Sequence, residues 1–242
     1  MDYFVILFIL IIFSFIQSIF GVGLLLFGTP SLLLIGYEYH EILNILLPAS
    51  ITISFLQVIK SKENINKSKK VFIYYCLPIL VLFTFIVLIN KNLINFKLII
   101  SIILIVSSLC ALNQNKIKNL KHIILKNNKI MLIAIGFIHG VSNMGGSFLS
   151  IFSTITNENK RVSRKNIAYC YLIMGLFQYT ILLSVYYYEL NFIYLYFIIL
   201  SMFIFYISEN IFVKISEKKF SKFISIISLI YGIYIFQNIL MN

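Results

Sequence analysis

The sequence predicts an all-α polytopic membrane protein. Of its 242 residues, 60% are hydrophobic and 12% are charged, whereas a soluble domain has roughly 25% charged residues. Apolar segments near or above the ~20 residues of a membrane helix recur along the chain. They lack the period-two alternation of barrel strands, and only helices or closed barrels satisfy their backbone hydrogen bonds in lipid. The chain should therefore be all-helical, with the lipid bilayer as its first partner.

Eight apolar runs mark the predicted elements in chain order. They cover residues 3–37, 42–59, 71–90, 98–115, 130–157, 166–188, 190–208 and 223–242. The three cysteines, Cys76, Cys110 and Cys170, lie within these runs without paired spacing. We therefore interpret them as packing residues, and we expect no metal site and no cofactor.

The basic residues decide how the runs cross the membrane. If every run were one crossing, ten Lys or Arg residues would lie on each side, against the positive-inside rule. If the first and fifth runs instead enter and leave on the same side as helical hairpins, eighteen of the 20 basic residues share one side. We therefore predict six crossings, two re-entrant hairpins and a multi-pass protein of the cytoplasmic membrane. The net charge of +12 then reflects orientation, and nucleic acid is not an expected partner.

Each predicted half contains one hairpin and three crossings, and because three is odd the second half is inverted relative to the first. The first repeat covers 1–115, with hairpin 3–37 and helices 42–59, 71–90 and 98–115. A basic cytoplasmic linker covers 116–129. The second repeat covers 130–242, with hairpin 130–157 and helices 166–188, 190–208 and 223–242.

Two glycine clusters occupy matching places in the two halves. A shift of 122 residues aligns Gly23 with Gly145, and Asn44 with Asn166. Glycines inside a long apolar run allow a helix to break and a ligand to approach, and such paired breaks indicate a transport site. They are also typical of close helix packing. The two aligned asparagines either line the path or cap the helix that follows each hairpin.

Hairpin tips direct helix N-termini at the membrane interior, where anions are favoured. Thr29-Pro30 is either an N-cap with Pro at the first helical position or a kink in a helix that begins at Leu24. Since neither hairpin contains an acidic residue, we expect a small anionic substrate. The predicted substrate-binding residues are Gln17, Gly21, Gly23, His139, Asn143, Gly145 and Gly146.

The glycine motifs carry a family resemblance that extends over nearly the whole chain. Residues 15–23 (FIQSIFGVG), followed by Pro30-Ser31-Leu32, resemble the first signature of the sulfite exporter TauE/SafE family, and residues 136–140 (GFIHG), followed by Gly145-Gly146, resemble its second. The resemblance implies a two-repeat transporter for sulfite, sulfonates or other small sulfur-containing or organic anions. The chain has Leu24 and Leu25 where the family has further glycines, and Gln17 and His139 where many members have Asp.

Several polar residues allow two interpretations from the sequence. His139 either carries a proton or holds an anion, or it is a neutral side chain bonded to backbone. Arg161, Arg164 and Lys165 either draw anions inward or anchor the chain at the membrane surface. Gln57 and Gln178 are predicted to join helices, and Tyr186, Tyr187 and Tyr188 to form an outer aromatic belt.

The sequence contains no catalytic pair, P-loop or GxGxxG motif, so an enzyme is not expected. We predict a secondary transporter or facilitator; the alternative is a membrane-embedded scaffold or assembly subunit without transport. The substrate, the direction of transport, coupling to a proton or sodium ion and assembly into a homo-oligomer stay open.

Overall fold

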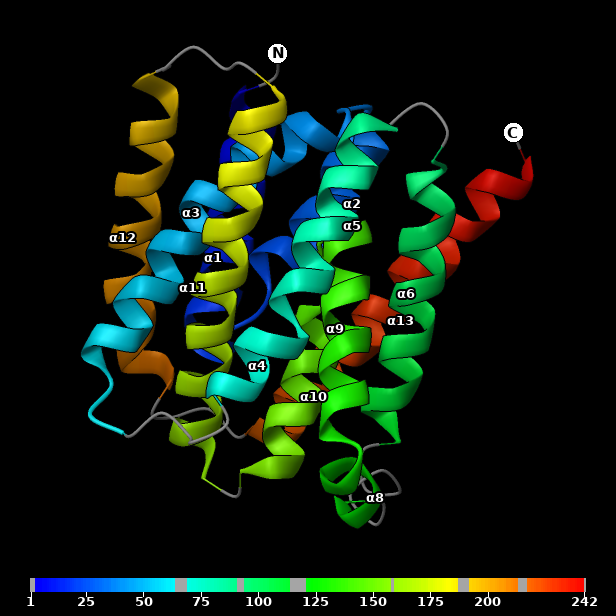
Figure 1. The fold of residues 1–242 in the computed structure, drawn as a ribbon. Coiled ribbons are helices and arrows are strands. Elements are labelled where there is room, and N and C mark those ends of the chain that lie inside the picture. Colours follow the sequence, from blue (N-terminus) through cyan, green and yellow to red (C-terminus); the bar gives the residue numbers. More distant parts are fainter. Residues whose placement is uncertain are drawn as a thin grey trace.

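A computed structural model describes residues 3–63, 69–90, 94–113, 121–157, 159–186, 192–212 and 217–241. These residues form helices and contain no strand, which confirms the all-α prediction (Figure 1). The helices are α1 (Tyr3–Phe20), α2 (Leu24–Ile35), α3 (Tyr39–Lys60), α4 (Lys69–Tyr75), α5 (Leu77–Ile89), α6 (Phe96–Leu112), α8 (Lys121–Lys126), α9 (Asn128–Ser142), α10 (Gly146–Thr156), α11 (Lys160–Val185), α12 (Phe192–Phe212) and α13 (Glu217–Met241).

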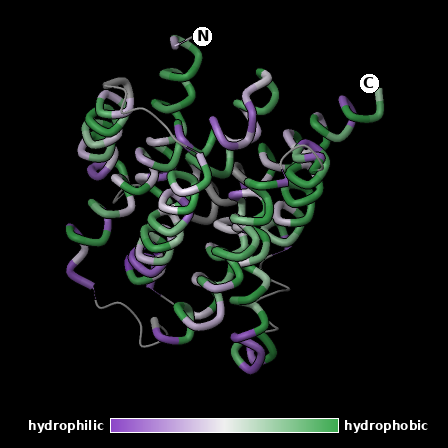
Figure 2. Tube along the Cα trace, turned by 45° about the horizontal axis from the view of Figure 1, so that its top comes forward, coloured by the Kyte–Doolittle hydropathy of each residue, from purple (hydrophilic) through white to green (hydrophobic). Residues whose placement is uncertain are grey.

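Five helical segments are long and apolar enough to cross a membrane, which agrees with a polytopic membrane protein. They are Tyr3–Phe20, Tyr39–Lys60, Lys70–Ile89, Lys160–Val185 and Tyr194–Ile211. Hydrophobic residues run along most of the helices, and hydrophilic segments gather mainly at helix ends, as at α8 (Figure 2). Large exposed side chains such as Phe4, Phe203 and Ile230 therefore have lipid as their natural surroundings.

The bundle has two chemically different ends. At the basic end, Lys165 of α11 donates to the backbone carbonyl of Ser61 after α3, and Arg164 pairs with Glu209 of α12. At the opposite end, which we call the aromatic end, Tyr39 stacks on Phe96 and His40 stacks on Tyr186. Helices α3 and α12 therefore run from the aromatic to the basic end, and α11 runs the other way (Figure 1).

Two helix pairs penetrate the bundle from opposite ends. Helix α1 descends from the aromatic end and α2 returns to it, so that the chain bends at Gly21–Gly23 (Figure 1). Helices α9 and α10 make the corresponding pair from the basic end, with a bend at Asn143–Gly145. In both pairs the first arm is the longer one, with 18 residues against 12 and 15 against 11.

Helices α3 and α11 pack together at the centre of the bundle; α3 contacts the first bend, and α11 contacts both bends. They approach closely where Gly175 of α11 faces Ile51 of α3, because a Cβ at Gly175 would lie 2.9 Å from the Ile51 side chain. Helices α6 and α13 pack together on the side away from α12, with Gly232 against Leu104 and Ile105 (Figure 1).

Several local expectations are corrected by the helix boundaries. Helix α3 begins after Glu38 and α11 after Asn159, which are their N-caps, so Asn44 and Asn166 lie inside helices and cap neither. The run 71–90 is divided at Cys76, just before Pro78, because proline has no N–H for the preceding turn. Of the expected aromatic belt, Tyr186 lies at the aromatic end and donates to the carbonyl of Leu88 at 3.0 Å. Tyr187 and Tyr188 lie outside the described residues.

Candidate functional site

The first bend requires glycine at two positions. Gly21 has φ +79° and Gly23 has φ +155°, in a region that favours glycine. A Cβ at Gly23 would lie 2.5 Å from the Ile16 side chain and 2.8 Å from the backbone nitrogen of Gln17. Glycine therefore allows α2 to start directly against the last turn of α1.

Polar groups of α3 hold the end of α1. The Gln17 side chain is fully buried; its Nε2 donates to the hydroxyl of Ser50 at 2.9 Å and to that of Ser54 at 3.3 Å. From the same face of α3, Gln57 Nε2 donates to the backbone carbonyls of Gln17 and Ser18, both at 2.9 Å. These carbonyls belong to the last turn of α1, where helix acceptors need outside donors.

Arg164 of α11 adds a positive charge at the same place. Its Nη2 donates to the carbonyl of Ser18 at 2.5 Å and to Glu209 Oε2 at 2.8 Å, and its Nη1 donates to Glu209 Oε1 at 3.2 Å. A cation at a helix C-terminus is favoured by the helix dipole. The first bend is thus held from α3, α11 and α12 together.

The second bend is shaped differently. Asn143 adopts the left-handed conformation with φ 64° and ends α9, and its N–H donates to the carbonyl of His139 at 2.8 Å. A Cβ at Gly145 would lie 2.6 Å from that of His139, and a Cβ at Gly146 would collide with the hydroxyl of Tyr171 on α11. Glycine at 145 and 146 therefore lets α10 start against both α9 and α11.

Buried polar groups without partners surround the second bend. Gln178 Nε2 donates to the carbonyl of His139 at 3.2 Å, and the His139 ring packs edge-on against Tyr171 with centroids 5.5 Å apart. Within the described part of the chain, several buried atoms here make no hydrogen bond of ordinary geometry: both His139 ring nitrogens, the Tyr171 hydroxyl, Gln178 Oε1 and Asn143 Oδ1. The Gln178 side chain lies beside the His139 ring and is its nearest polar neighbour. Since buried polar groups normally find partners, these atoms are available to a ligand or to water.

Both short arms begin without a side-chain cap. Gly23 precedes α2 and Gly145 precedes α10, and neither position supplies a capping side chain. The first turn of each helix therefore directs backbone N–H groups and positive dipole charge into the protein interior. Helix α2 begins at Leu24 with Pro30 inside it, so Thr29-Pro30 is not an N-cap; of the two readings above, the helix that begins at Leu24 is the correct one.

The two bends meet the same helix at different heights. A Cβ at Gly21 would lie 3.1 Å from Ile167, whereas Gly146 faces Tyr171, four residues or about 6 Å further along α11. A direct link is the donation from Asn143 Nδ2 to Thr29 Oγ1 of α2 at 3.4 Å. Among the described residues no hydrogen bond joins Gln17 to His139, so the predicted residues form two adjoining groups on α3 and α11.

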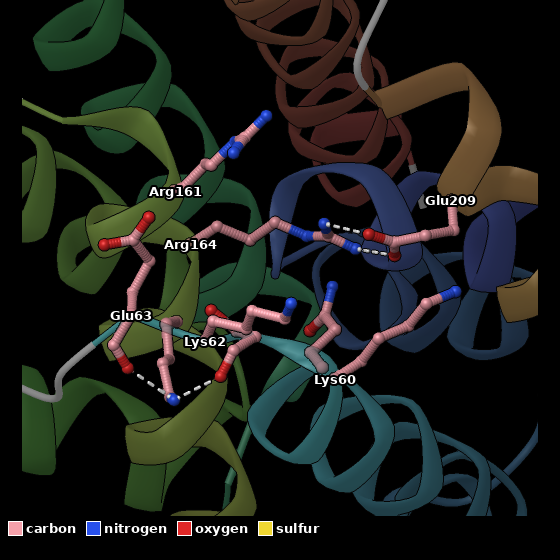
Figure 3. A pocket seen from close by; sticks show the side chains of 9 residues that line it. Lys60, Lys62, Glu63, Arg161, Arg164 and Glu209 are labelled. Carbon is pink, nitrogen blue, oxygen red and sulfur yellow. Dashed lines mark hydrogen bonds and ion pairs between the residues drawn. The ribbon is translucent and has the colours of Figure 1, made fainter.

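A cavity of about 370 Å³ opens at the basic end, next to the first bend (Figure 3). None of the seven predicted residues lines it. Its lining consists of Gln57, Lys60, Ser61, Lys62, Glu63, Arg161, Arg164, Lys165 and Glu209. Five cations against two carboxylates give it a formal excess of three positive charges, so its electrostatic preference is for anions.

Some side chains of the two bends were not predicted as site residues. Ser50, Ser54 and Gln57 follow one another at helical spacing on one face of α3, and that pattern could have revealed them. Tyr171 and Gln178 are seven residues apart on α11 and could have been found in the same way. Glu209 offers no sequence signal for its pairing with Arg164, because the two residues are 45 positions apart.

The fold and these bends define a polytopic helical membrane protein whose core is built around two broken helices. The family model for the sulfite exporter TauE/SafE matches residues 5–235. The chain therefore belongs to this family of membrane transporters, as its glycine motifs predicted. No curated protein and no solved structure matches the chain.

Proposed function

We propose that this protein is a secondary transporter or facilitator of a small anion, such as sulfite, a sulfonate or a small carboxylate, in the cytoplasmic membrane. The observation that carries the proposal is the group of buried polar atoms at the second bend that have no partner among the described residues, next to the uncapped N-terminus of α10. Among these groups, the Tyr171 hydroxyl, one ring nitrogen of a neutral His139 and the backbone N–H groups of the helix N-terminus can donate to an anion, whereas the amide oxygens of Gln178 and Asn143 only accept. Such donors stabilise an anion without a fixed counter-charge.

The roles of the predicted residues follow from their surroundings. The N-terminus of α10 at Gly146 donates to the anion together with the second N–H of Asn143 Nδ2, whose first N–H donates to Thr29. His139 and Tyr171 complete the same wall. Gln17 is engaged by Ser50 and Ser54, so it holds the first bend in place before the anion arrives. Gly21, Gly23 and Gly145 keep the bends narrow enough for these contacts.

The proposal also requires a moving part, because Gln17, His139 and Asn143 are all fully buried. The opposite directions of the α1–α2 and α9–α10 pairs support an inverted repeat, in which each half gates access from one side. The basic end, which contains Lys60, Arg161, Arg164 and Lys165, faces the cytoplasm under the positive-inside rule.

Orientation can be tested with single cysteines in a background without Cys76, Cys110 and Cys170. Lys62→Cys at the basic end and Asn90→Cys at the aromatic end are both exposed positions. A membrane-impermeant thiol reagent should label Asn90→Cys in intact cells and Lys62→Cys only after permeabilisation. The reverse pattern would contradict the proposed orientation.

Flux is the direct test of function. Proteoliposomes containing the folded protein should take up sulfite, methanesulfonate or acetate faster than empty liposomes. Gly146→Leu should abolish this uptake, whereas the control Thr180→Ala, at an exposed position bonded to its own helix, should not change it. If folded protein moves none of these anions and instead copurifies with a partner at fixed stoichiometry, the non-transporting scaffold is the correct function.

A further inference from the structure

The cavity at the basic end contains a recognition element that the proposed transport site does not use. Arg164 reaches across the cavity to Glu209, as Figure 3 shows, and the two carboxylate oxygens accept one N–H each from Nη1 and Nη2. The same two-pronged arrangement binds the oxygens of a free carboxylate, sulfite or sulfonate. Glu209 therefore occupies the position that an incoming anion would take.

The surroundings of this pair favour such an exchange. The side chain of Arg164 is 11% exposed and that of Glu209 is 21% exposed, so the pair is partly shielded but open to the cavity. With about 30 Å³ per water molecule, 370 Å³ holds a small anion with several waters. Lys62 points towards Arg164 in Figure 3, and it adds positive potential where the anion would enter.

The other lining cations have different tasks. Lys165 Nζ donates to the carbonyls of Ser61 and Glu63, at 2.6 and 2.5 Å, and so fixes the chain that leaves α3. Lys60 Nζ lies over the rings of Phe205 and Tyr206 on α12, 5.5 and 5.3 Å from their centroids. Arg164 is thus distinguished from both by a carboxylate that a substrate can replace.

The pair also connects the cavity to the first bend. The Nη2 group that binds Glu209 also donates to the carbonyl of Ser18 in the last turn of α1. Glu209 lies near the end of α12, so the ion pair ties α12 to α11 and, through Arg164, to α1. An anion that displaces Glu209 would release α12 while the positive charge at the end of α1 is kept.

We propose that the Arg164 guanidinium is an anion-binding site at the cytoplasmic mouth of the pathway, and that Glu209 is a built-in competitor that an incoming sulfite-like oxyanion or carboxylate displaces. This inference rests on the proposed function, because it makes the cavity the entrance to the transport site from the basic end. The displaced Glu209 unlocks the basic end, so that opening depends on the presence of substrate.

Binding measurements on the purified protein in phosphatidylcholine nanodiscs test the site without requiring flux. Sulfite and methanesulfonate are titrated by calorimetry into the wild type and three variants. Glu209→Gln keeps the shape of the side chain but removes its charge, so Kd should fall by about fivefold or more. Arg164→Gln should raise Kd by at least about tenfold.

Lys62→Gln is the matched control, since it removes one positive charge from the same cavity without touching the ion pair. Its Kd should change by less than about threefold. Equal losses of anion affinity in Lys62→Gln and Arg164→Gln would mean that the overall positive potential of the cavity attracts the anion. That result would overturn the specific site at Arg164. Glu209→Gln keeps the shape of the side chain and should not disturb the fold. An unchanged Kd in this variant would therefore show that Glu209 does not compete with the anion. If the gain in Glu209→Gln disappears in nanodiscs with phosphatidylglycerol, the site holds a lipid headgroup and the inference fails.

Flux in proteoliposomes separates this inference from the proposed function. If the protein moves anions but Kd does not depend on Arg164, the proposed transport function stands and the anion site at Arg164 is wrong. If binding depends on Arg164 and Glu209 but no anion is transported, the anion site stands and the proposed transport function is wrong. If both hold, Glu209→Gln should lower KM for uptake from the basic side and leave KM from the aromatic side unchanged.

Discussion

The two bends of this protein differ in how completely their polar groups are satisfied. At the first bend, Gln17 is engaged by two hydroxyls of α3, and the carbonyls behind it are held by Gln57 and Arg164. At the second bend, His139 and Tyr171 are buried with unpartnered polar atoms. Within the described residues the first bend also has two buried oxygens without a hydrogen bond, Ser18 Oγ and Gln57 Oε1, but its central side chain, Gln17, is engaged, whereas His139 at the second bend is not. The first bend is thus the better-satisfied anchor, and the second has more unused capacity for hydrogen bonding.

Matching sequence motifs therefore need not have matching roles in this protein. Gln17 and His139 occupy equivalent places after a shift of 122 residues, but within the described residues the side-chain nitrogen of Gln17 has hydrogen-bond partners and the ring nitrogens of His139 have none of ordinary geometry. Unsatisfied polar groups in a low-dielectric interior are costly. A ligand that forms hydrogen bonds with these groups would therefore gain binding free energy at the second bend. The first bend, whose hydrogen bonds are largely formed, would stay in place while other parts move.

The largest effect is expected where the anchor is most crowded. Gly23→Ala forces a φ of +155° on alanine and puts its Cβ against Ile16 and Gln17, so it should cost about 2–4 kcal/mol of stability. Gly36→Ala is the matched control, because Gly36 has φ +103° but no atom of the described residues lies within 4 Å of the added Cβ. It should cost about 1 kcal/mol.

Thermal unfolding in detergent, followed by intrinsic fluorescence or by size-exclusion recovery, compares the two glycine variants. Similar midpoints for Gly23→Ala and Gly36→Ala would mean that the first bend relaxes readily. The anchor would then have to be assigned to the second bend instead.

An intermediate effect separates the two glutamines that hold the bends. Gln57 donates two hydrogen bonds to the end of α1 and Gln178 donates one to the end of α9. Since interhelical hydrogen bonds in membranes average about 0.6 kcal/mol, Gln57→Met should cost about 1–2 kcal/mol and Gln178→Met about 0.6 kcal/mol. Chemical denaturation in mixed micelles would measure both, and a larger loss for Gln178→Met would reverse the roles of the two bends.

Much of the fold could be predicted from the sequence, because its signals are local or additive. Hydrophobic run length predicted helices, and the glycine clusters at 21–23 and 145–146 predicted where they break. Boundaries were less predictable: α11 begins at Lys160, six residues before Asn166, because Asn159 supplies the cap in a charged segment that a hydropathy argument excludes. Length alone also did not reveal that α1 would extend to 18 residues and α2 only to 12.

The candidate site was predictable only in part, since its contacts join distant segments. His139 and Asn143 stood out as polar residues in an apolar run, and the structure places both at the second bend. Tyr171 could not be identified in an aromatic-rich chain, because only the fold brings its hydroxyl against Gly146. The pairing of Arg164 with Glu209 likewise depends on how α11 and α12 pack.

The smallest effect on stability, and the most selective one on transport, is expected at Tyr171. Its hydroxyl is fully buried and makes no hydrogen bond within the described part of the chain, so Tyr171→Phe removes a polar group that has no partner in this conformation. The free energy of unfolding should change by less than about 0.5 kcal/mol or rise slightly. Anion flux should fall by about fivefold or more if the hydroxyl donates to the substrate when the site opens.

Proteoliposome uptake and thermal unfolding, measured on one preparation, would test both halves of this expectation. A Tyr171→Phe protein with full flux would move the anion to the first bend, and one with lower stability would mean that the hydroxyl has a structural partner when folded in lipid.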